Sequence, residues 1–267
     1  PEVPLCNGAV TTLASAGILA YGPNKEAARL EGSKAFSKDF LAKHGIPTAS
    51  YGNFSEIQPA LEYLSNCSLP VVVKASGLAA GKGVLICSTL KEAESAVQDM
   101  LEGASFGDSG REVVIEEFLK GIELSVFGVS DGKDWKVLAS AKDYKRIFDN
   151  DEGPNTGGMG AISPVPFADE AFMKKVFDRI LKPTYDGLVA EGHPYKGFLF
   201  VGLMNVGGEP LVIEYNVRMG DPETEAIFPR LKTSMLDLLE AVADEKLNQI
   251  EIELDDRTAA TIFLVSG

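Results

Sequence analysis

Residues 69–86 read LPVVVKASGLAAGKGVLI, two runs of strand-forming residues joined by a glycine-rich loop. Three valines lead directly into Lys74, so we expect a strand that ends in a fixed cation. The loop that follows is almost entirely glycine and alanine, and residues this small let backbone N–H groups approach an anion closely. We therefore predict a phosphate-binding unit made of strand, loop and strand, and we call residues 69–86 the phosphate clamp.

Two familiar nucleotide motifs do not fit this loop. A Walker A loop has four residues between its glycines and a hydroxyl residue after its lysine, whereas three residues separate Gly77 from Gly81 and Gly83 follows Lys82. The dinucleotide fingerprint needs a third glycine where Ile86 stands. On these residues alone, a glycine-rich hairpin without a ligand stays an alternative.

Composition limits the function classes. The 267 residues are 45% hydrophobic and carry a net charge of −14, so the chain can bury a large core but should repel nucleic acid and anionic membranes. Three widely spaced cysteines favour free thiols in a reducing compartment, and no apolar run reaches the about 20 residues of a membrane helix. The chain begins with Pro1 and ends in an apolar run, so we expect both ends to continue in a longer polypeptide.

Periodicity and turn signals predict alternating helices and strands. We expect helices at residues 10–16, 33–44, 57–64, 90–101, 169–191 and 234–243, with Thr89 and Glu92 as a capping box at the start of the fourth. We expect strands at residues 18–21, 49–51, 113–119, 122–129, 135–139, 197–206 and 211–216, and from residue 258, with 122–129 and 135–139 as an antiparallel pair. Lys34 and Lys38 lie one turn apart on the second helix, and we interpret them as a solvated basic face.

Two further segments carry candidate ligand-binding residues. Residues 141–166 lose regular periodicity, so we predict a long polar, glycine-rich loop that contacts a ligand. In the later strand VIEYN, Glu214 and Asn216 share one face because side chains alternate with period two. Two oxygen donors on one face suit Mg²⁺.

Taken together, seven stretches resemble the glycinamide ribonucleotide synthetase (phosphoribosylamine–glycine ligase) family of the ATP-grasp superfamily. They are PEVPL, GSKAFSKDF, VVVKASGLAAGKGV, EEFLKGIE, DYKR, NTGGMGAISP and EYNVRMGDPET. The resemblance implies an ATP-grasp fold of mixed α+β and α/β character, with two α+β subdomains after part of a Rossmann-like α/β domain. The implied divisions are an N-terminal domain end at 1–30, a linking segment at 31–68, a small lid at 69–139, a large subdomain at 140–245 and the start of a C-terminal domain at 246–267.

The resemblance also assigns site residues in this sequence. It implies that ATP is bound by Lys74, Ala80, Gly81, Lys82, Gly83, Glu116, Glu117, Phe118, Leu119, Glu123, Arg146 and Asn155. It implies that the other substrates are bound by Asp143, Lys145, Gly157, Gly158, Arg218, Asp221, Pro222, Glu223 and Thr224. Glu214 and Asn216 would be the metal ligands. Tyr144 stands where the family often has histidine, so we expect no proton transfer there.

The implied activity is ATP-dependent ligation of glycine to 5-phosphoribosylamine through glycyl phosphate, in de novo purine biosynthesis in the cytoplasm. The implied cofactors are ATP and Mg²⁺, or Mn²⁺ in its place, and the resemblance allows covalent fusion to another purine-pathway enzyme. Two alternatives stay open: another ATP-grasp ligase or carboxylase, and a nucleotide-binding fragment without catalysis. With His44 and His193 as its only histidines, the sequence gives little support to nucleophilic catalysis by a catalytic triad.

Overall fold

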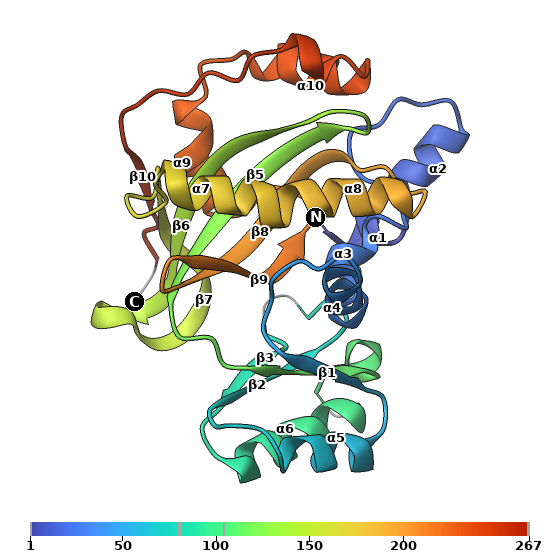
Figure 1. Cartoon of the computed structure of the whole chain (residues 1–267), viewed down its shortest axis with the longest axis vertical. Helices are drawn as coiled ribbons and strands as arrows, with labels where there is room; N and C mark the ends of the chain where they lie inside the picture. The colour runs from blue at the N-terminus through green and yellow to red at the C-terminus, as the bar shows by residue number, and fades with distance from the viewer. Residues whose placement is uncertain (1, 80–81, 104, 266–267) are drawn as a thin grey trace.

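Two antiparallel sheets organise the molecule, a four-stranded sheet at one end and a six-stranded sheet that fills most of the rest (Figure 1). This description rests on a computed structural model and covers residues 2–79, 82–103 and 105–265, without the side chains of Asp151 and Asn155. Among the helices in these ranges, none has the length and apolar character needed to cross a bilayer.

The smaller lobe is built on the predicted strand–loop–strand unit. Its strands are β1 (Tyr51–Phe54), β2 (Val71–Ala75), β3 (Val84–Cys87) and β4 (Val113–Glu117), in the order β1-β4-β2-β3. Helices α5 (Ile57–Leu64) and α6 (Leu90–Leu101) pack against this sheet, and the short helix η1 (Gly107–Gly110) precedes β4. The predicted capping box of α6 is confirmed, because Thr89 and Glu92 each cap the other's backbone N–H.

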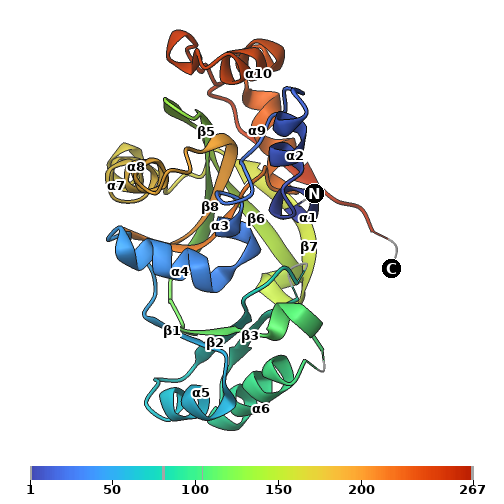
Figure 2. The ribbon, with the colours of Figure 1, turned by 90° about the vertical axis from the view of Figure 1, so that its right-hand side faces the viewer.

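The larger lobe is a sheet with helices on both faces (Figure 2). Its strands are β5 (Ile122–Asp131), β6 (Trp135–Phe148), β7 (Glu152–Ser163), β8 (Lys196–Val206), β9 (Glu209–Asn216) and β10 (Ala259–Ile262), in the order β10-β7-β6-β5-β8-β9. The short helix η2 (Asp149–Asp151) joins β6 to β7.

Alternation along β5 explains the two layers of helices. Leu124 and Val126 face a core that includes the continuous helical segment α7 (Glu170–Val176), η3 (Phe177–Leu181) and α8 (Lys182–Ala190). Phe127 and Val129 face the opposite core, which includes α9 (Glu223–Ile227), η4 (Phe228–Arg230), α10 (Met235–Ala243) and η5 (Leu247–Gln249). Side chains of β5 alternate between its two faces with period two, so the strand contributes to the core on each side of the sheet.

The N-terminal segment supplies the helices beside the junction of the two sheets. It contains α1 (Glu2–Cys6), α2 (Ala9–Ser15), α3 (Arg29–Gly32) and α4 (Lys34–Lys43). Ser33 caps α4 by accepting a hydrogen bond from the N–H of Phe36, and α4 contacts both β4 of the small sheet and β9 of the large sheet. One predicted strand is wrong: residues 18–21 form no strand, and Ile18 and Leu19 are exposed without a neighbouring strand to pair with.

The prediction of a loop at residues 141–166 is also wrong. Most of it forms the end of β6 and all of β7, which pair with Asp143 opposite Ala161. The glycines that indicated a loop are compatible with a strand here. A Cβ on Gly160 would lie 2.4 Å from the backbone oxygen of Thr261 in β10, so glycine permits the close approach of that strand.

Strand membership also differs from the predicted lid at 69–139. The small sheet takes its strands from residues 51–117, since β1 joins it from the predicted linking segment. The hairpin of β5 and β6 is confirmed as an antiparallel pair, but it belongs to the large sheet. We therefore propose residues 118–121, which connect β4 to β5, as the boundary between the two lobes.

Candidate nucleotide and metal site

Lys74, the predicted phosphate cation, lies where the two sheets meet. It is on β2, and its Nζ donates a hydrogen bond of 3.4 Å to the backbone oxygen of Ile213 on β9. The next residue along β9 is Glu214, one of the two predicted metal ligands. Strand β2, which carries Lys74, and strand β9, which carries the predicted metal ligands, therefore meet at the junction of the lobes.

Glu214 is a carboxylate surrounded by lysines. Burial raises its pKa, but Lys145, Lys74 and Lys34 outweigh this effect and hold the pKa of Glu214 below its usual value. The three lysines come from β6, β2 and α4, so three separate elements direct positive charge to one carboxylate. Cations gathered around an ionised metal ligand suit the binding of metal-bound phosphates.

Lys34 is a site residue that the sequence reasoning missed, and its interpretation as solvated was wrong. Its side chain is partly buried, and its Nζ donates 3.3 Å to the backbone oxygen of Gly77, in the loop after β2. Burial lowers the pKa of Lys34, while Glu214 opposes that change. The missed signal was the stretch GSK itself: the backbone N–H of Lys34 donates 2.8 Å to the oxygen of Ser76, which ties the start of α4 to the clamp.

Lys38 is also buried, contrary to the prediction of a solvated face. Its side chain is 3% exposed, and its Nζ lies 3.0 Å from Glu116 Oε2, while Lys74 Nζ lies 2.9 Å from Glu116 Oε1. Burial lowers the pKa of Lys38 to about 8, against the opposing effect of Glu116. Helical periodicity predicted the basic face of α4 correctly, but that face packs against β4 rather than facing water.

The donor set of β9 fits a divalent cation that shares its coordination with a substrate. Glu214 is held ionised, and the Asn216 side-chain oxygen has a 3.3 Å contact from Arg218 Nη2. In the described ranges no group of three or more His, Cys, Asp or Glu side chains could hold a metal ion. A cation bound by Glu214 and Asn216 would therefore need oxygens from a bound phosphate or water, the mode of binding that Mg²⁺ prefers.

An acidic group lies beside this cationic cluster. Lys145 Nζ contacts Glu123 Oε1 at 2.6 Å and Asp143 Oδ2 at 3.4 Å. Burial lowers the pKa of Lys145, but these two carboxylates outweigh it and raise the pKa above its usual range. Three predicted residues on β5 and β6 are thus brought together, with Glu123 engaged by Lys145.

The two motifs NTGGMG and RMGDPET also meet. Gly158 of β7 has φ +128°, and a Cβ on it would lie 2.4 Å from Pro222 Cδ. Just beyond, Glu223 is 3% exposed and its Oε1 accepts a 3.1 Å hydrogen bond from Ser125. Burial, followed by the charge of Asp143, raises the pKa of Glu223 to about 7.

Arg218 links the end of β9 to the N-terminal helices. Its Nη2 lies 2.9 Å from Glu31 Oε1, and the backbone N–H of Val217 donates 2.7 Å to Glu31 Oε2. Burial raises the pKa of Glu31, with Arg218 opposing. Glu31 was not among the residues predicted from the sequence. It precedes the GSK stretch and fixes the backbone directly after Asn216.

The residues predicted to border adenine connect the two lobes. Glu117 is exposed and accepts a 2.6 Å hydrogen bond from the Ser50 hydroxyl, and Phe118 and Leu119 follow it, partly exposed, in the link to β5. In the clamp loop, Lys82 is exposed and Gly83 is buried. The predicted ligands Ala80 and Gly81 lie outside the described residues.

The remaining predicted residues lie at the edge of the site. Arg146 pairs with Asn155 in the register of β6 and β7 and donates 2.6 Å to the backbone oxygen of Gly153, and no described contact joins it to Glu214. Gly157 and Asp221 are exposed, and Thr224 donates a hydrogen bond to the Gly220 oxygen. Tyr144 is 45% exposed, with Lys142 Nζ 5.0 Å from its ring centre.

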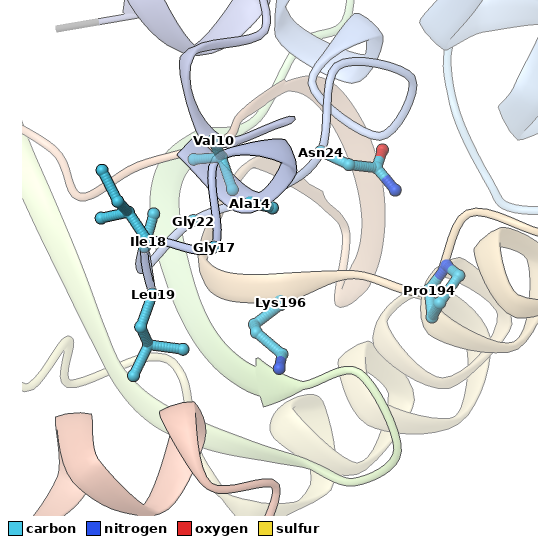
Figure 3. Close-up of a pocket in the computed structure, with 10 residues that line it drawn as sticks. Val10, Ala14, Gly17, Ile18, Leu19, Gly22, Asn24, Pro194 and Lys196 are labelled. Atoms are coloured by element: carbon cyan, nitrogen blue, oxygen red, sulfur yellow. The ribbon is translucent and has the colours of Figure 1, made fainter. Parts of the chain in front are cut away.

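A separate open cavity of about 430 Å³ lies between α2 and the start of β8 (Figure 3). Apolar residues such as Ile18 and Leu19 line it, together with Asn24 and Lys196. Among the residues that the structure describes, no predicted site residue borders this cavity, and Lys196 is the only cation in its lining. It therefore does not contribute to the nucleotide and metal site.

The fold and the site define the class of protein as ATP-grasp, in which two α+β lobes meet over a lysine-lined nucleotide site. Comparison with known proteins then gives the family. The family described as "Phosphoribosylglycinamide synthetase, ATP-grasp (A) domain" matches residues 32–224. The chain belongs to this family, which confirms the predicted resemblance and fold class.

Individual relatives agree with that assignment. The chain is similar to phosphoribosylamine–glycine ligases of Vibrio parahaemolyticus, with 51% identity, and Escherichia coli K12, with 50% identity, in both cases over 100% of this chain and 62% of the relative. The chain thus spans about three fifths of the length of the curated relatives it matches. The crystal structure of the Thermotoga maritima phosphoribosylamine–glycine ligase has a TM-score of 0.84 and 38% identity, over 91% of this chain and 61% of that one.

A more distant likeness shows the fold alone. The biotin carboxylase domain of Hydrogenobacter thermophilus 2-oxoglutarate carboxylase, solved with MgADP, ADP and bicarbonate, has a TM-score of 0.73 and 17% identity over 94% of this chain and 54% of that one. The lobes of the ATP-grasp architecture are thus shared with an enzyme of different chemistry.

Proposed function

We propose that the chain is the ATP-binding core of a phosphoribosylamine–glycine ligase. The observation that carries the proposal is the contact between β2 and β9 at the junction of the two lobes, where Lys74 Nζ lies 3.4 Å from the oxygen of Ile213, the residue before Glu214, and where Lys145, Lys74 and Lys34 lower the pKa of Glu214. The 50–51% identity to ligases of that name over the full chain supports the choice of substrates.

The reaction proceeds in two transfers. A glycine carboxylate oxygen attacks the γ-phosphorus of ATP, ADP leaves, and glycyl phosphate forms. The amine of 5-phosphoribosylamine then attacks the glycyl carbonyl, phosphate leaves, and glycinamide ribonucleotide is released for purine biosynthesis. Neither transfer needs a nucleophile from the protein, so catalysis rests on positioning and charge neutralisation.

The residues of the site fit those two tasks. Lys74 and Lys34 neutralise the phosphates of ATP from the small lobe and from α4, while Lys145 does so from the large lobe. Glu117 to Leu119 lie where the lobes join and border the adenine, with Glu123 directed at the ribose and Arg146 and Asn155 near the phosphates. Lys82 and Gly83, at the end of the loop between β2 and β3, would contact the nucleotide phosphates from the small lobe.

Glu214 and Asn216 would hold Mg²⁺, or Mn²⁺ in its place. Bound there, the ion supplies charge neutralisation for the phosphate oxygens of ATP. The two side chains orient the nucleotide relative to the lysines, and Arg218 orients Asn216 through their 3.3 Å contact.

The acidic end of the site is suited to the amine-bearing substrates. Asp143 is 7% exposed and its Oδ2 lies 3.4 Å from Lys145 Nζ, so its carboxylate can accept hydrogen bonds from an ammonium group. Gly157 and Gly158 with the turn from Asp221 to Thr224 line the same end. Arg218 offers a guanidinium for a carboxylate or phosphate.

An assay of ADP release tests the proposal. A polypeptide that carries this chain together with the remaining length of its relatives is incubated with MgATP, and each substrate is omitted in turn. ADP release that requires both glycine and 5-phosphoribosylamine is expected. Release that requires bicarbonate or a different acid would indicate another ATP-grasp ligase or carboxylase, and no release with retained ATP binding would indicate a non-catalytic fragment.

On this proposal the enzyme acts on small, water-soluble metabolites in the cytoplasm. Its acidic net charge gives it no role in binding nucleic acid or anionic membranes. Covalent fusion to another enzyme of purine biosynthesis stays part of the proposal on the family resemblance alone.

A further inference from the structure

Lys38 is a buried cation that has no role in the proposed reaction. It lies on α4, one turn after Lys34, and its side chain is 3% exposed. Its Nζ contacts Glu116 Oε2 at 3.0 Å and donates 2.6 Å to the Thr48 hydroxyl. A lysine this deeply buried is rare unless it is paired, so its position calls for a reason.

The anchor of Lys38 belongs to the large lobe. The Thr48 hydroxyl donates 2.7 Å to the backbone oxygen of Val212 on β9, and the N–H of Val212 donates 2.8 Å to the oxygen of Pro47. Thr48 also bridges Val212 in parallel register. Lys38 is therefore fixed to the strand that carries Glu214, whatever Lys74 does.

Lys74 is anchored less firmly than Lys38. Both lysines pair with Glu116 at similar distances, 2.9 Å for Lys74 and 3.0 Å for Lys38, but Lys38 is also held by its 2.6 Å hydrogen bond to the Thr48 hydroxyl. The hydrogen bond that Lys74 does make, to the Ile213 oxygen, is long at 3.4 Å. Lys74 thus stabilises Glu116 by charge while it stays free to turn toward another anion.

Glu116 needs another counterion when Lys74 turns away from it. Its side chain is 5% exposed, and removing the partner of a buried charge is strongly destabilising because the charge has lost its water. With Lys38 in place, one cation remains on Glu116 after the other has moved to a phosphate.

We propose that Lys38 is the permanent counterion of Glu116, and that it acts as a positioning residue by releasing Lys74 to bind the phosphates of the nucleotide. The inference rests on the proposed ATP site. It predicts that loss of Lys38 holds Lys74 on Glu116, so that nucleotide affinity falls although Lys38 does not contact the nucleotide.

Binding of the β,γ-methylene analogue of ATP with Mg²⁺ tests this, measured by calorimetry on a polypeptide that carries this chain and the remaining length of its relatives. Lys38→Met should weaken binding at least about tenfold, which corresponds to about 1.4 kcal/mol. Lys43→Met is the matched control, because Lys43 lies on the same helix, is 64% exposed and pairs with Glu191. That control should stay within about twofold, as expected of a surface ion pair.

A double-mutant cycle separates the counterion role from a structural one. In a Glu116→Gln background no carboxylate needs a partner, so adding Lys38→Met should change affinity by less than about threefold. This comparison remains informative if Lys38→Met alone does not fold, since the double variant removes both charges of the pair.

Each outcome decides the matter. Unchanged affinity in Lys38→Met, or a tenfold loss that persists in the Glu116→Gln background, would overturn the inference while the proposed ATP site stands. Failure of the unsubstituted chain to bind the analogue would instead overturn the proposed site, and the inference with it.

Discussion

Gly158→Ala should disrupt the contact between the two motifs that line the substrate end of the site. At φ +128° an alanine is strained by about 1–3 kcal/mol. Its Cβ would also lie 2.4 Å from Pro222 Cδ, about 1 Å inside normal contact, and overpacking of this kind costs about 1–3 kcal/mol. The two effects together should lower the free energy of unfolding by about 2–6 kcal/mol.

Thermal unfolding followed by circular dichroism measures this effect. For a chain of this size the loss corresponds to a fall in melting temperature of about 5–20 °C. Gly157→Ala is the matched control, because a Cβ there meets no atom within 4 Å and its φ lies outside the left-handed region. It should change stability by less than about 0.5 kcal/mol. If both variants melted at the temperature of the unsubstituted chain, the packing of β7 against the turn at Pro222 would be refuted.

Two further predictions concern carboxylates of the site. Glu214→Ala should lower kcat at least about 100-fold in Mg²⁺-dependent ADP release, because the lysines lose the metal ligand they surround, and near-normal turnover would contradict the metal assignment. Burial, then Asp143, raises the pKa of Glu223 from 4.5 to about 7, so the native state holds a proton between these pH values that the unfolded chain has lost. The resulting stabilisation is complete below pH 4.5 and is lost as the pH rises through 7, by up to about 3 kcal/mol. The free energy of unfolding in urea, measured at pH 5 and at pH 8, should therefore depend less on pH in Glu223→Gln than in the unsubstituted protein. An equal pH dependence in the two proteins would refute the raised pKa of Glu223.

The strand–loop–strand form of the clamp could be predicted from the sequence because its signals are local. Two short apolar runs rich in β-branched residues flank a loop of small residues, a pattern that favours two strands, and β2 and β3 pair with Lys74 opposite Val84. The capping box of α6 and the period-two spacing of Glu214 and Asn216 are local in the same sense. For these features the neighbouring residues were sufficient evidence.

The errors arose where a distant segment determines the environment. Periodicity gave α4 a basic face, but not that β4 and the clamp cover it, so Lys34 and Lys38 were interpreted as solvated. The glycine-rich composition of residues 141–166 indicated a loop. The glycines of β7 do not reveal that this strand pairs with β10, which lies far away in the sequence. Glu31 was missed because its partner Arg218 lies 187 residues further along the sequence.

The most direct test of the proposed function follows an oxygen atom. Glycine labelled with ¹⁸O in both carboxylate oxygens is supplied with MgATP and 5-phosphoribosylamine to a polypeptide that carries the chain and the remaining length of its relatives. If glycyl phosphate forms and breaks as proposed, each released phosphate should carry one ¹⁸O from glycine when examined by mass spectrometry. Unlabelled phosphate released together with glycinamide ribonucleotide would contradict the account.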